Sequence, residues 1–446
     1  MLERANDTPD KIRRLQIKLY LAAKRSPSRR FHALYDKVQR TDVLERAWHQ
    51  VKTNHGAPGI DAETIEAIEA SGVQAFLATL QAELASGTYR PQAVRRVRIP
   101  KPQGGERLLG VPTVRDRVVQ AAVKIVIEPL FEADFANCSF GFRPRRSALQ
   151  ARERIGIGMQ RERRLWVVDA DIRSFFDELD RVILLALLRR RISDRRVLGL
   201  IRSWLEAGVF DQGALLHPEA GTPQGGVISP LLANVYLNTL DQWWQKHCGA
   251  LGVLTRFADD LVILCEQQDQ AERALEVLTS MLAKLRLQLS PTKTRVVGLA
   301  DGTTGFDFLG FHNRWIPVFG SPRRRHAASW PSQRAMQAAR QRIRELTPAQ
   351  RVGLPISVIV QDINRFLHGW IAYFRYGNSA QQFKSFDRYV KHRLSRFISR
   401  KHGRSGPNHG LAVLLESKTQ LGLMHASGSV RYGFAHAGGE RVRRAV

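Results

Sequence analysis

The chain has 446 residues, of which 69 are lysine or arginine and 41 are aspartate or glutamate, so its formal net charge is +28. Apolar residues make up 43% and charged residues 25%, a globular composition that excludes wholesale disorder and allows two or three domains with cores of their own. Such a charge indicates a polyanionic partner, with nucleic acid as the first candidate, and the alternative is a basic protein whose charge only solvates its surface.

Charge distribution, cysteine use and hydropathy narrow the class further. Residues 312–446 hold 24 basic and 5 acidic side chains, a net of +19, whereas residues 1–311 carry a net of only +9. Cys138, Cys248 and Cys265 include no C-x-x-C pair, so neither a disulfide framework nor a cysteine-rich zinc module is expected. The N-terminus lacks the apolar core of a signal peptide, and no run reaches the roughly 18 apolar residues of a membrane span. We therefore expect a cytoplasmic protein without a membrane partner.

The first part of the chain predicts helices and one basic hairpin. Residues 10–50 are mostly helical in pattern, the loop 56–61 breaks that pattern, and residues 65–84 are helical again. Residues 94–111 alternate between apolar and basic side chains around a Gly- and Pro-containing turn, which predicts a β-hairpin. A helix is expected next, over 118–131.

The middle of the chain alternates strands and helices. We expect buried strands at 165–171, 254–258 and 261–265. We expect helices at 182–205, 229–244 and 271–285, with a loop at 221–226. Mixed elements in this order are typical of an α/β or α+β catalytic domain.

The C-terminal part predicts a second, helical domain. Residues 298–331 are rich in Gly, Pro and Arg, and we interpret them as the passage to it. Pro355 opens a long amphipathic helix, and a second helix follows with its aromatic residues on one face. The other face of that second helix carries Arg388, Lys391, Arg393, Arg396 and Arg400. Residues 403–410 form a flexible break, and the last 36 residues are basic without a strong pattern.

Two adjacent acids, Asp259 and Asp260, lie between two apolar strand-like runs. A two-residue hairpin turn prefers Asn-Gly or Gly-X because it needs a positive φ, so Asp-Asp is a poor choice there and also places like charges together. A magnesium ion would offset both costs, because it takes carboxylate oxygens as ligands. The alternative is a solvated acidic turn.

A third acid, Asp171, ends the apolar strand that begins at Leu165, which is a poor place for a residue that serves only solubility. Together with Asp259 and Asp260 it would give two strands that present carboxylates to one point. Two divalent ions about 4 Å apart could be held there and clamp an in-line phosphoryl displacement. The stretch GTPQGGVISP (221–230) adds glycines that permit close approach to a ligand, although alone it could be a plain turn before a helix.

These pieces, in this order, resemble the group II intron-encoded reverse transcriptases, also called maturases, from about Gly56 to the C-terminus. DIRSFFD (171–177) resembles motif A, GTPQGGVISPLLANVYLNTLD (221–241) motif B and FADD (257–260) motif C. LSPTKT (289–294) resembles motif D, and FDFLGF (306–311) the primer-grip region. RRVRIPKPQGGERLLGVPTVRDRVVQ and SFGFRPRRSALQA resemble the fingers blocks. Single motifs are moderately specific, but the ordered set is highly specific.

The resemblance implies an α+β fold. It would be a right-hand polymerase, with fingers and palm built on an antiparallel sheet, plus an α-helical thumb/maturase (X) domain and a basic C-terminal arm. The corresponding domains are an N-terminal helical extension (1–55), fingers and palm (56–311), the thumb (312–402) and a DNA-binding-like region (403–446). The last of these rests on position and charge only.

By this resemblance, Asp171, Asp259 and Asp260 are the catalytic residues and bind two Mg²⁺ ions, for which Mn²⁺ could substitute. Asp171 and Asp259 would be the principal ligands. One ion would activate the primer 3′-hydroxyl, and the other would hold the triphosphate and the leaving pyrophosphate. Asp169 and Asp177 are expected to have structural roles.

The resemblance also implies which residues contact the incoming deoxynucleoside triphosphate (dNTP). These are Lys101, Arg107, Ile172, Phe176, Gln224 and Lys293. Lys101 and Arg107 would bind phosphate oxygens, and Phe176 would be the steric gate that excludes a ribose 2′-hydroxyl. Lys293 matches the motif D lysine, a candidate for protonating pyrophosphate. Outside the family context, each could equally be an ordinary surface or core side chain.

The implied partners are group II intron RNA, an RNA template with a DNA primer, target DNA and dNTPs. The basic helix face from Arg388 to Arg400 would track phosphates of a hybrid duplex or of intron RNA. Motif C carries Phe257 where Tyr is commoner, with little expected effect on catalysis. The chain stops without an HNH endonuclease domain, so second-strand nicking is not expected, and a mobile intron would insert at a replication fork or another single-stranded target.

We therefore expect an RNA-directed DNA polymerase that also acts as a maturase in splicing and retrohoming, in the cytoplasm of a bacterium and on the nucleoid when bound to target DNA. Two alternatives remain open at this point. One is a splicing cofactor whose polymerisation is incidental, and the other is a domesticated relative in DNA repair or phage defence. A generic two-metal nuclease is more remote, since the fingers and thumb blocks would then have no purpose.

Overall fold

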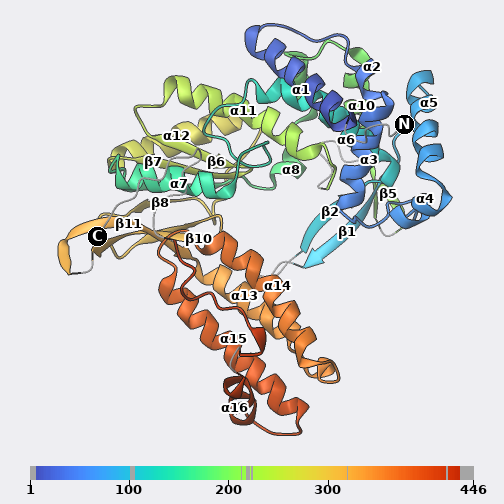
Figure 1. Cartoon of the computed structure of the whole chain (residues 1–446). Helices are drawn as coiled ribbons and strands as arrows, with labels where there is room; N and C mark the ends of the chain where they lie inside the picture. The colour runs from blue at the N-terminus through green and yellow to red at the C-terminus, as the bar shows by residue number, and fades with distance from the viewer. Residues whose placement is uncertain are drawn as a thin grey trace.

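The computed structural model describes residues 7–100, 106–211, 213–216, 221, 225–318, 320–417 and 420–431. Figure 1 shows a central layered domain, a mostly helical N-terminal region beside it and a helical bundle that extends below both. Helices and mainly antiparallel strands make this a mixed α+β fold, which confirms that part of the expected fold class. No helix among these residues is both long and apolar enough to cross a membrane.

The central domain is built on a sheet in the order β6-β7-β3-β8, in which every neighbouring pair is antiparallel. Its strands are β3 (Trp166–Asp171), β6 (Val253–Phe257), β7 (Asp260–Cys265) and β8 (Arg295–Gly298). The covering helices are α7 (Ala148–Gln160), α11 (Ser229–His247) and α12 (Gln268–Lys284). Leu261 and Ile263 of β7 share a core with α11 and α12. Val262 and Leu264 share another core with α7. Because both faces are covered, β7 is apolar throughout instead of alternating.

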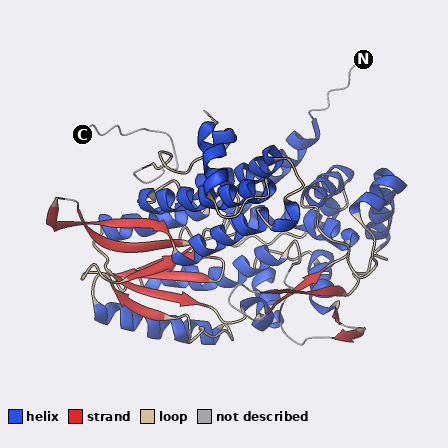
Figure 2. Ribbon diagram, turned by 90° about the horizontal axis from the view of Figure 1, so that it is seen from below, coloured by secondary structure: helices blue, strands red, loops and turns tan. Residues whose placement is uncertain are grey.

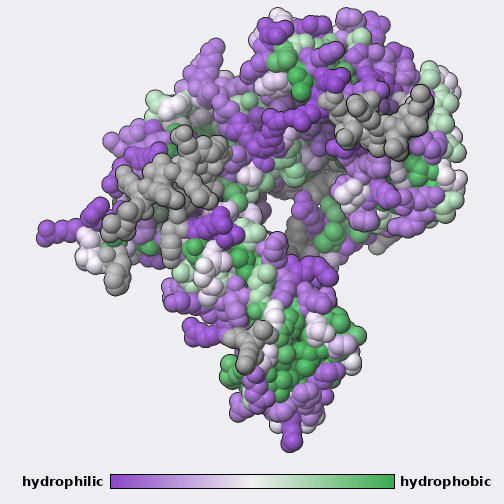
Figure 3. Space-filling model, viewed as in Figure 1, coloured by the Kyte–Doolittle hydropathy of each residue, from purple (hydrophilic) through white to green (hydrophobic). Residues whose placement is uncertain are grey.

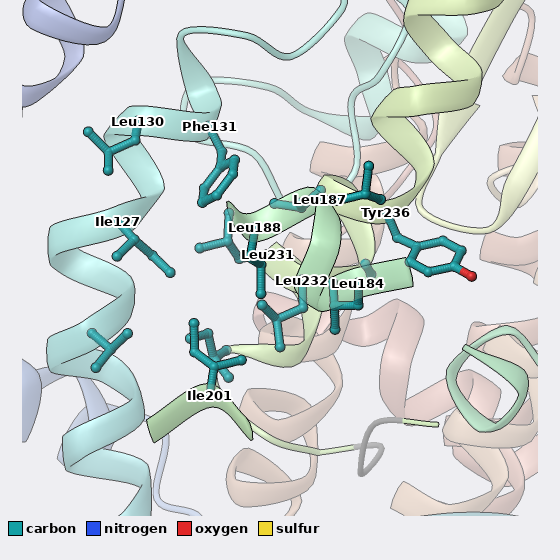
Figure 4. Close-up of a cluster of buried hydrophobic side chains, with 14 of the residues drawn as sticks. Ile127, Leu130, Phe131, Leu184, Leu187, Leu188, Ile201, Leu231, Leu232 and Tyr236 are labelled. Atoms are coloured by element: carbon teal, nitrogen blue, oxygen red, sulfur yellow. The ribbon is translucent and has the colours of Figure 1, made fainter. Parts of the chain in front are cut away.

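The largest core lies between the central sheet and the N-terminal region. Its helices include α6 (Val114–Glu132), α9 (Arg181–Arg189) and α10 (Arg195–Glu206). Figure 4 shows how side chains of these helices and of α11 converge, among them Phe131, Leu188 and Tyr236. The single helix expected over 182–205 is interrupted in the structure. Asp194 ends the connection and caps α10, because its carboxylate accepts hydrogen bonds from the first backbone N–H groups of that helix.

Among the described residues, five helices form the N-terminal region, of which the first three pack against α6. They are α1 (Asp7–Arg25), α2 (Tyr35–Val38), α3 (Thr41–Thr53), α4 (Ile65–Ser71) and α5 (Val73–Ser86). The expected helical stretches at 10–50 and 65–84 are thus present, each broken into shorter helices. Trp48 of α3 and Tyr35 of α2 are buried, and the Tyr35 hydroxyl donates to the Leu84 carbonyl at 2.8 Å. The first helices therefore brace the region that carries the basic hairpin.

The predicted basic hairpin belongs to a second small sheet. β1 (Val94–Pro100) and β2 (Glu106–Val111) are antiparallel, from the pair Arg95 and Val111 to the pair Pro100 and Glu106. β1 also pairs in parallel with β4 (Val209–Asp211), which pairs with β5 (Ala214–Leu216). An ion pair also joins β1 to β4, because the Arg98 Nη2 atom lies 2.9 Å from Asp211 Oδ2.

The stretch expected to be a passage, 298–331, instead forms a three-stranded sheet in the order β11-β10-β9. Its strands are β9 (Gly305–Phe308), β10 (Phe311–Val318) and β11 (Ser321–Pro331). The expectation of a linker was wrong because apolar residues alternate with the Gly, Pro and Arg residues and can be buried on one face of a sheet. Phe306, Phe308 and Trp315 enter the core under α7. The domain boundary predicted after residue 311 falls inside this sheet and stays a prediction.

The bundle has its own core. It consists of α13 (Gln333–Leu346), η1 (Ala349–Arg351), α14 (Ile356–Phe374), α15 (Ala380–Lys401), α16 (Asn408–Glu416) and η2 (Gln420–Gly422). The two long helices expected from periodicity are α14 and α15, and most of their aromatic residues are buried as expected, whereas Phe366 is half-buried. Trp370 packs against Phe386 with ring centroids 4.7 Å apart. The sequence pattern predicted neither α13 nor α16.

Candidate active site

Asp171 and Asp260 lie directly opposite one another at the ends of two neighbouring strands. They are partners in the antiparallel register of β3 and β7, one step beyond the pair Ala170 and Leu261. Opposed residues of an antiparallel pair have Cβ atoms about 4.5–5.5 Å apart on the same face. The fold therefore brings these two predicted site residues together.

The third predicted carboxylate, Asp259, lies in the turn between β6 and β7. Phe257 pairs with Asp260, so the two turn residues are Ala258 and Asp259. The expectation that both aspartates form the turn is therefore wrong by one residue. The positive φ that the turn requires falls on Ala258 (φ 57°), and Asp260 is the first regular residue of β7.

The carboxylates perturb one another. Loss of solvent, followed by repulsion from Asp259 and Asp171, raises the pKa of Asp260 to about 7. The pKa of Asp259 is raised as well, first by desolvation and then by the charge of Asp171, whereas Arg107 and Lys293 act in the opposite direction. The cluster thus holds more negative charge than its basic neighbours offset, which is the condition that favours binding of a cation.

The segment predicted as motif D runs beside Asp171. Ser290 N donates to the Asp171 carbonyl at 2.8 Å, and Lys293 Nζ lies 2.6 Å from Asp171 Oδ2. Asp171 is only 16% exposed, so this ion pair lies at the edge of the protein interior. On the same strand, Asp169 pairs with Arg295 at 3.1 Å, a contact that suits the structural role expected for Asp169.

A buried arginine holds the turn that carries Asp259. Arg256 Nη1 donates to the carbonyl of turn residue Ala258 at 2.9 Å and to Asn234 Oδ1 at 3.1 Å. Its Nε donates to Asp241 Oδ1 at 2.8 Å, and its Nη2 to Ser139 Oγ at 2.8 Å. Both Arg256 and Asp241 are completely buried. Sequence reasoning missed this residue, although an arginine inside an otherwise apolar strand was a signal that a buried partner exists.

The backbone of Gly141 closes on the same turn. A Cβ atom at this glycine would lie 2.5 Å from Ala258 N, so no side chain fits between the two segments. Asn234 Nδ2 donates to the Gly141 carbonyl at 2.8 Å, which ties this loop to the hydrogen bonds of Arg256. The stretch that resembles a fingers block therefore supports the turn directly.

The basic hairpin reaches the carboxylates, as far as it is described. Arg107 of β2 is close enough to Asp259 to lower the pKa of that carboxyl. The segment predicted as motif B packs on the same strand. A Cβ atom added to Gly225 would lie only 2.5 Å from the Gly110 carbonyl oxygen. Because Gly225 also has a positive φ of 117°, only glycine fits at this position. Lys101 and Gln224, two of the predicted dNTP contacts, lie outside the described residues.

Two predicted dNTP contacts follow Asp171 along the chain. Ile172 is 2% exposed and its side chain belongs to the large core, so its main chain is the part left to face a nucleotide. Phe176 lies on α8 (Phe175–Glu178), half-buried, with its ring centroid 5.3 Å from that of Phe175 in an edge-on arrangement. That packing holds the ring in place, and its predicted role as a steric gate stays a prediction.

The predicted nucleic-acid face of α15 is only partly present. Arg388, Arg396 and Arg400 are exposed on one side of the helix, and Lys391 is half-buried. Arg393 instead turns into the bundle, where its Nη2 donates to the carbonyl and hydroxyl oxygens of Thr347, both at 3.2 Å. The expectation that Arg393 belongs to the outer face is therefore wrong, because those two acceptors hold it at the junction of α13 and α15.

The donor set suits a hard divalent cation. Within the described residues, no three His, Cys, Asp or Glu side chains are already arranged around one metal position. Asp171 is engaged by Lys293, and the aspartates repel one another. Carboxylate oxygens with uncompensated charge are the ligands that Mg²⁺ and similar ions prefer. Asp171, Asp259 and Asp260 could therefore hold such an ion if Lys293 moved aside.

Two family models match this chain. Residues 99–313 match the family described as reverse transcriptase (RNA-dependent DNA polymerase), and residues 336–412 match the maturase-specific domain of group II introns. The first range covers the hairpin, the central sheet and the three aspartates. The second covers the bundle from α13 to the first half of α16.

Curated proteins with similar sequences include two that are named for introns. Protein YkfC of Escherichia coli is 34% identical over 336 residues, which are 67% of this chain and 87% of YkfC. The group II intron-encoded protein LtrA of Lactococcus lactis is 37% identical over 216 residues, which are 48% of this chain but only 35% of LtrA. Nuclear intron maturase 4 of Arabidopsis thaliana is 27% identical over 219 residues, or 49% of this chain and 26% of that protein.

Proposed function

This chain belongs to the group II intron-encoded reverse transcriptases, which combine a reverse transcriptase domain with a maturase domain, and we propose how its residues divide the two activities. As an RNA-directed DNA polymerase it would extend a DNA primer on an RNA template with dNTPs. As a maturase it would bind group II intron RNA and support splicing and retrohoming into target DNA.

We propose that the three parts of the molecule act as the palm, fingers and thumb of a right-hand polymerase. The central sheet with its aspartates would be the palm, and the basic hairpin with its helices would be the fingers. The bundle would be the thumb. Figure 3 shows the surface hollowed between these three parts, where a primer–template duplex could lie. The basic C-terminal region (403–446) would contact DNA, and residues 418–419 and 432–446 of it lie outside the described residues.

Asp171, Asp259 and Asp260 would hold the divalent ions on which reverse transcriptase domains generally depend. We propose two Mg²⁺ ions, with Asp171 and Asp259 as principal ligands. When bound, such ions polarise phosphoryl oxygens and lower the pKa of a coordinated hydroxyl. Lys293 would then leave Asp171 and become available to donate a proton to pyrophosphate.

Arg107 and Lys101 on the basic hairpin would bind the triphosphate, the first as a planar fork and the second as a point charge. Gln224 would lie near the pair of template base and incoming nucleotide. Phe176 would exclude a 2′-hydroxyl from the sugar position. The exposed arginines of α15 would track phosphates of the duplex or of intron RNA.

One observation supports the catalytic assignment most directly. The register of β3 and β7 sets Asp171 opposite Asp260, the turn adds Asp259, and the hairpin arginine Arg107 acts electrostatically on the same point. In a solvated acidic turn the carboxylates would keep ordinary pKa values. Here three carboxylates from two strand ends and the turn between β6 and β7 lie together, and the pKa values of Asp259 and Asp260 are raised.

Primer extension tests the assignment. Asp259→Ala should lower the extension rate on an RNA template by at least about a hundredfold, because a lost metal ligand removes several kcal/mol of transition-state stabilisation. Asp169→Asn is the matched control, since Asp169 lies on β3, two residues before Asp171, but pairs with Arg295. It should keep most of the activity. Wild-type extension rates with Asp259→Ala would remove this site from the reaction.

A further inference from the structure

The hairpin of β10 and β11 projects from the central domain on the side away from the hollow. It is the leftmost part of both ribbon views (Figures 1 and 2). β10 pairs with β11 from Phe311 and Pro331 outward to Val318 and Ser321, whereas β9 accompanies only the inner residues of β10, from Phe311 to Arg314. The outer half therefore has no third strand, and a primer–template duplex in the hollow does not require it.

Four exposed arginines lie on this hairpin and on the loop beside it. Arg323 and Arg324 are at the hairpin tip, and Arg161 and Arg163 follow α7. The loop and the hairpin are in contact, because the Arg163 guanidinium lies over the Trp315 ring, 5.0 Å from its centroid. We call these four residues the arginine surface.

The arginine surface is not balanced by acids. No hydrogen bond or ion pair joins Arg161, Arg163, Arg323 or Arg324 to a carboxylate in the part of the chain that the structure describes. The nearest acid in sequence, Glu162, is already paired with Arg154 and Arg164. Solubility does not explain like charges placed side by side on a projecting hairpin and its neighbouring loop in a protein whose net charge is +28, and guanidinium groups without acid partners suit phosphates.

A pocket of about 370 Å³ opens beside the arginine surface. Its wall includes Gln160, which directly precedes Arg161, together with His326 of β11 and the amides of Asn313 and Asn378. Its volume is in the range of small-ligand pockets. His326 Nδ1 is buried and has no hydrogen-bond partner among the described residues, and burial lowers the pKa of this ring. The ring is thus neutral at pH 7, with one donor and one acceptor.

We propose that this face is a second RNA-binding site, in which the arginine surface holds backbone phosphates and the pocket accepts an unpaired base. Amides and a neutral imidazole offer the donors and acceptors that base edges need, and RNA with unpaired loops presents bases that can be splayed out in this way. Duplex DNA could supply the phosphates but not the free base. The inference rests on the proposed RNA-binding function and adds a surface that the polymerase reaction does not use.

Binding of a labelled stem–loop RNA over a range of salt concentrations tests the arginine surface. Arg323→Gln with Arg324→Gln should weaken binding about tenfold and reduce the slope of log K against log salt by about one to two, because up to two phosphate contacts are lost. The control is Arg273→Gln with Arg342→Gln, which removes the same charge from arginines already paired with Glu276 and Glu345. An equal loss in the control would overturn the proposal, since affinity would then follow net charge alone.

The pocket requires a different readout. His326→Ala should weaken stem–loop binding several-fold without changing the salt slope, because contacts to bases release no counterions. The same variant should bind duplex DNA of equal length as the wild type does. Unchanged stem–loop affinity in His326→Ala, or a fall shared equally with duplex DNA, would overturn the base pocket. Extension of a short primer–template hybrid, measured in parallel, reports the polymerase independently, so failure of that assay would concern the aspartates and not this surface.

Discussion

At the scale of single residues, Arg256 decides how firmly the turn that carries Asp259 is held. Deleting one partner of a buried ion pair costs about 3–5 kcal/mol, so Arg256→Ala is expected to unfold the domain. Arg256→Lys keeps the charge beside Asp241 but loses the fork that also reaches Ala258 and Ser139. Its kcat in primer extension should fall about 10- to 100-fold, since small misplacements of catalytic groups have effects of that size.

A positioning role for Arg256 can be separated from a purely structural one. If the turn loosens, the Mg²⁺ concentration at half-maximal activity should rise, and excess Mg²⁺ should restore part of the rate. Ser139→Ala removes one acceptor of the same guanidinium and should shift both quantities less, in the same direction. A lower melting temperature with unchanged kcat and unchanged Mg²⁺ requirement would limit Arg256 to stability.

Asp260 gives a pH dependence whose sign is fixed by its raised pKa. Its pKa is about 7 in the folded protein against an ordinary value of 3.8, so the folded state holds the proton more tightly. The proton on Asp260 therefore stabilises the folded state fully below about pH 4, and this stabilisation is lost as the pH rises through 7. In EDTA, Asp260→Asn should therefore melt about 1–2 °C higher than the wild type at pH 8, with no difference at pH 4. The effect is small because Asp260, although crowded by neighbouring protein atoms, keeps contact with solvent, which screens its charge.

Added Mg²⁺ serves as the internal control for this prediction. A bound cation relieves the repulsion among the aspartates, so the advantage of Asp260→Asn at pH 8 should disappear or reverse. Equal melting temperatures of wild type and variant at every pH in EDTA would show that Asp260 is not under strain from its neighbours.

At the scale of elements, strands and helices with strong periodicity were predictable, and their boundaries were not. β3, β6 and β7 follow from apolar runs, and α14 and α15 from one-sided periodicity. The stretch 298–331 was misread because its Arg and Pro residues hid the alternation of Phe306, Phe308 and Trp315, which becomes visible only once α7 covers them. The break at Asp194 depends on a side-chain cap, which a hydrophobic pattern does not show.

The candidate site divides in the same way. Its aspartates were recognisable because carboxylates stand out beside apolar strands. The resemblance to the family motifs then assigned each aspartate its place in the site. The register error at Asp259 and Asp260 arose because the residue with positive φ is Ala258, which no turn preference would choose. Arg256 and Arg393 show the remaining limit: the strand around Arg256 indicates that it has a buried partner, but only tertiary contacts identify the acceptors of either arginine.

The loop that carries Gly141 acts on the catalytic turn as a unit. Gly141→Ala places a Cβ atom against the Ala258 backbone, which must move for the side chain to fit. Extension by this variant should fall about 10- to 100-fold, while the fold survives with a lower melting temperature. Gly199→Ala in α10 is the matched control, because nothing lies within 4 Å of its Cβ position and alanine favours a helix. Wild-type kcat for Gly141→Ala would mean that the turn accommodates the shift freely.

At the scale of the whole molecule, the chain forms separate cores rather than one. The central sheet and the N-terminal region share the largest core, with a smaller one under α7, and the bundle has another built on α13 to α16. The reverse transcriptase and maturase matches follow that division, at residues 99–313 and 336–412. The net charge of +28 is therefore distributed over separate parts of the fold, and the three aspartates that we propose for catalysis lie among basic residues that we propose to bind nucleic-acid backbones.

This distribution predicts a steep dependence of RNA binding on salt. If the bundle, the β10–β11 hairpin and the C-terminal region each contact phosphates, a plot of log K for RNA binding against log salt concentration should have a slope of about −4 or steeper. Each neutralised phosphate releases about 0.7–0.9 counterions. Arg388→Gln, Arg396→Gln and Arg400→Gln together remove the exposed arginines of α15 and should flatten the slope by about two. Asp259→Ala is the control, since we expect it to impair extension while it leaves these arginines in place, and its slope should equal that of the wild type. A slope near −1 for the wild-type protein would mean that most of its basic residues only solvate the surface.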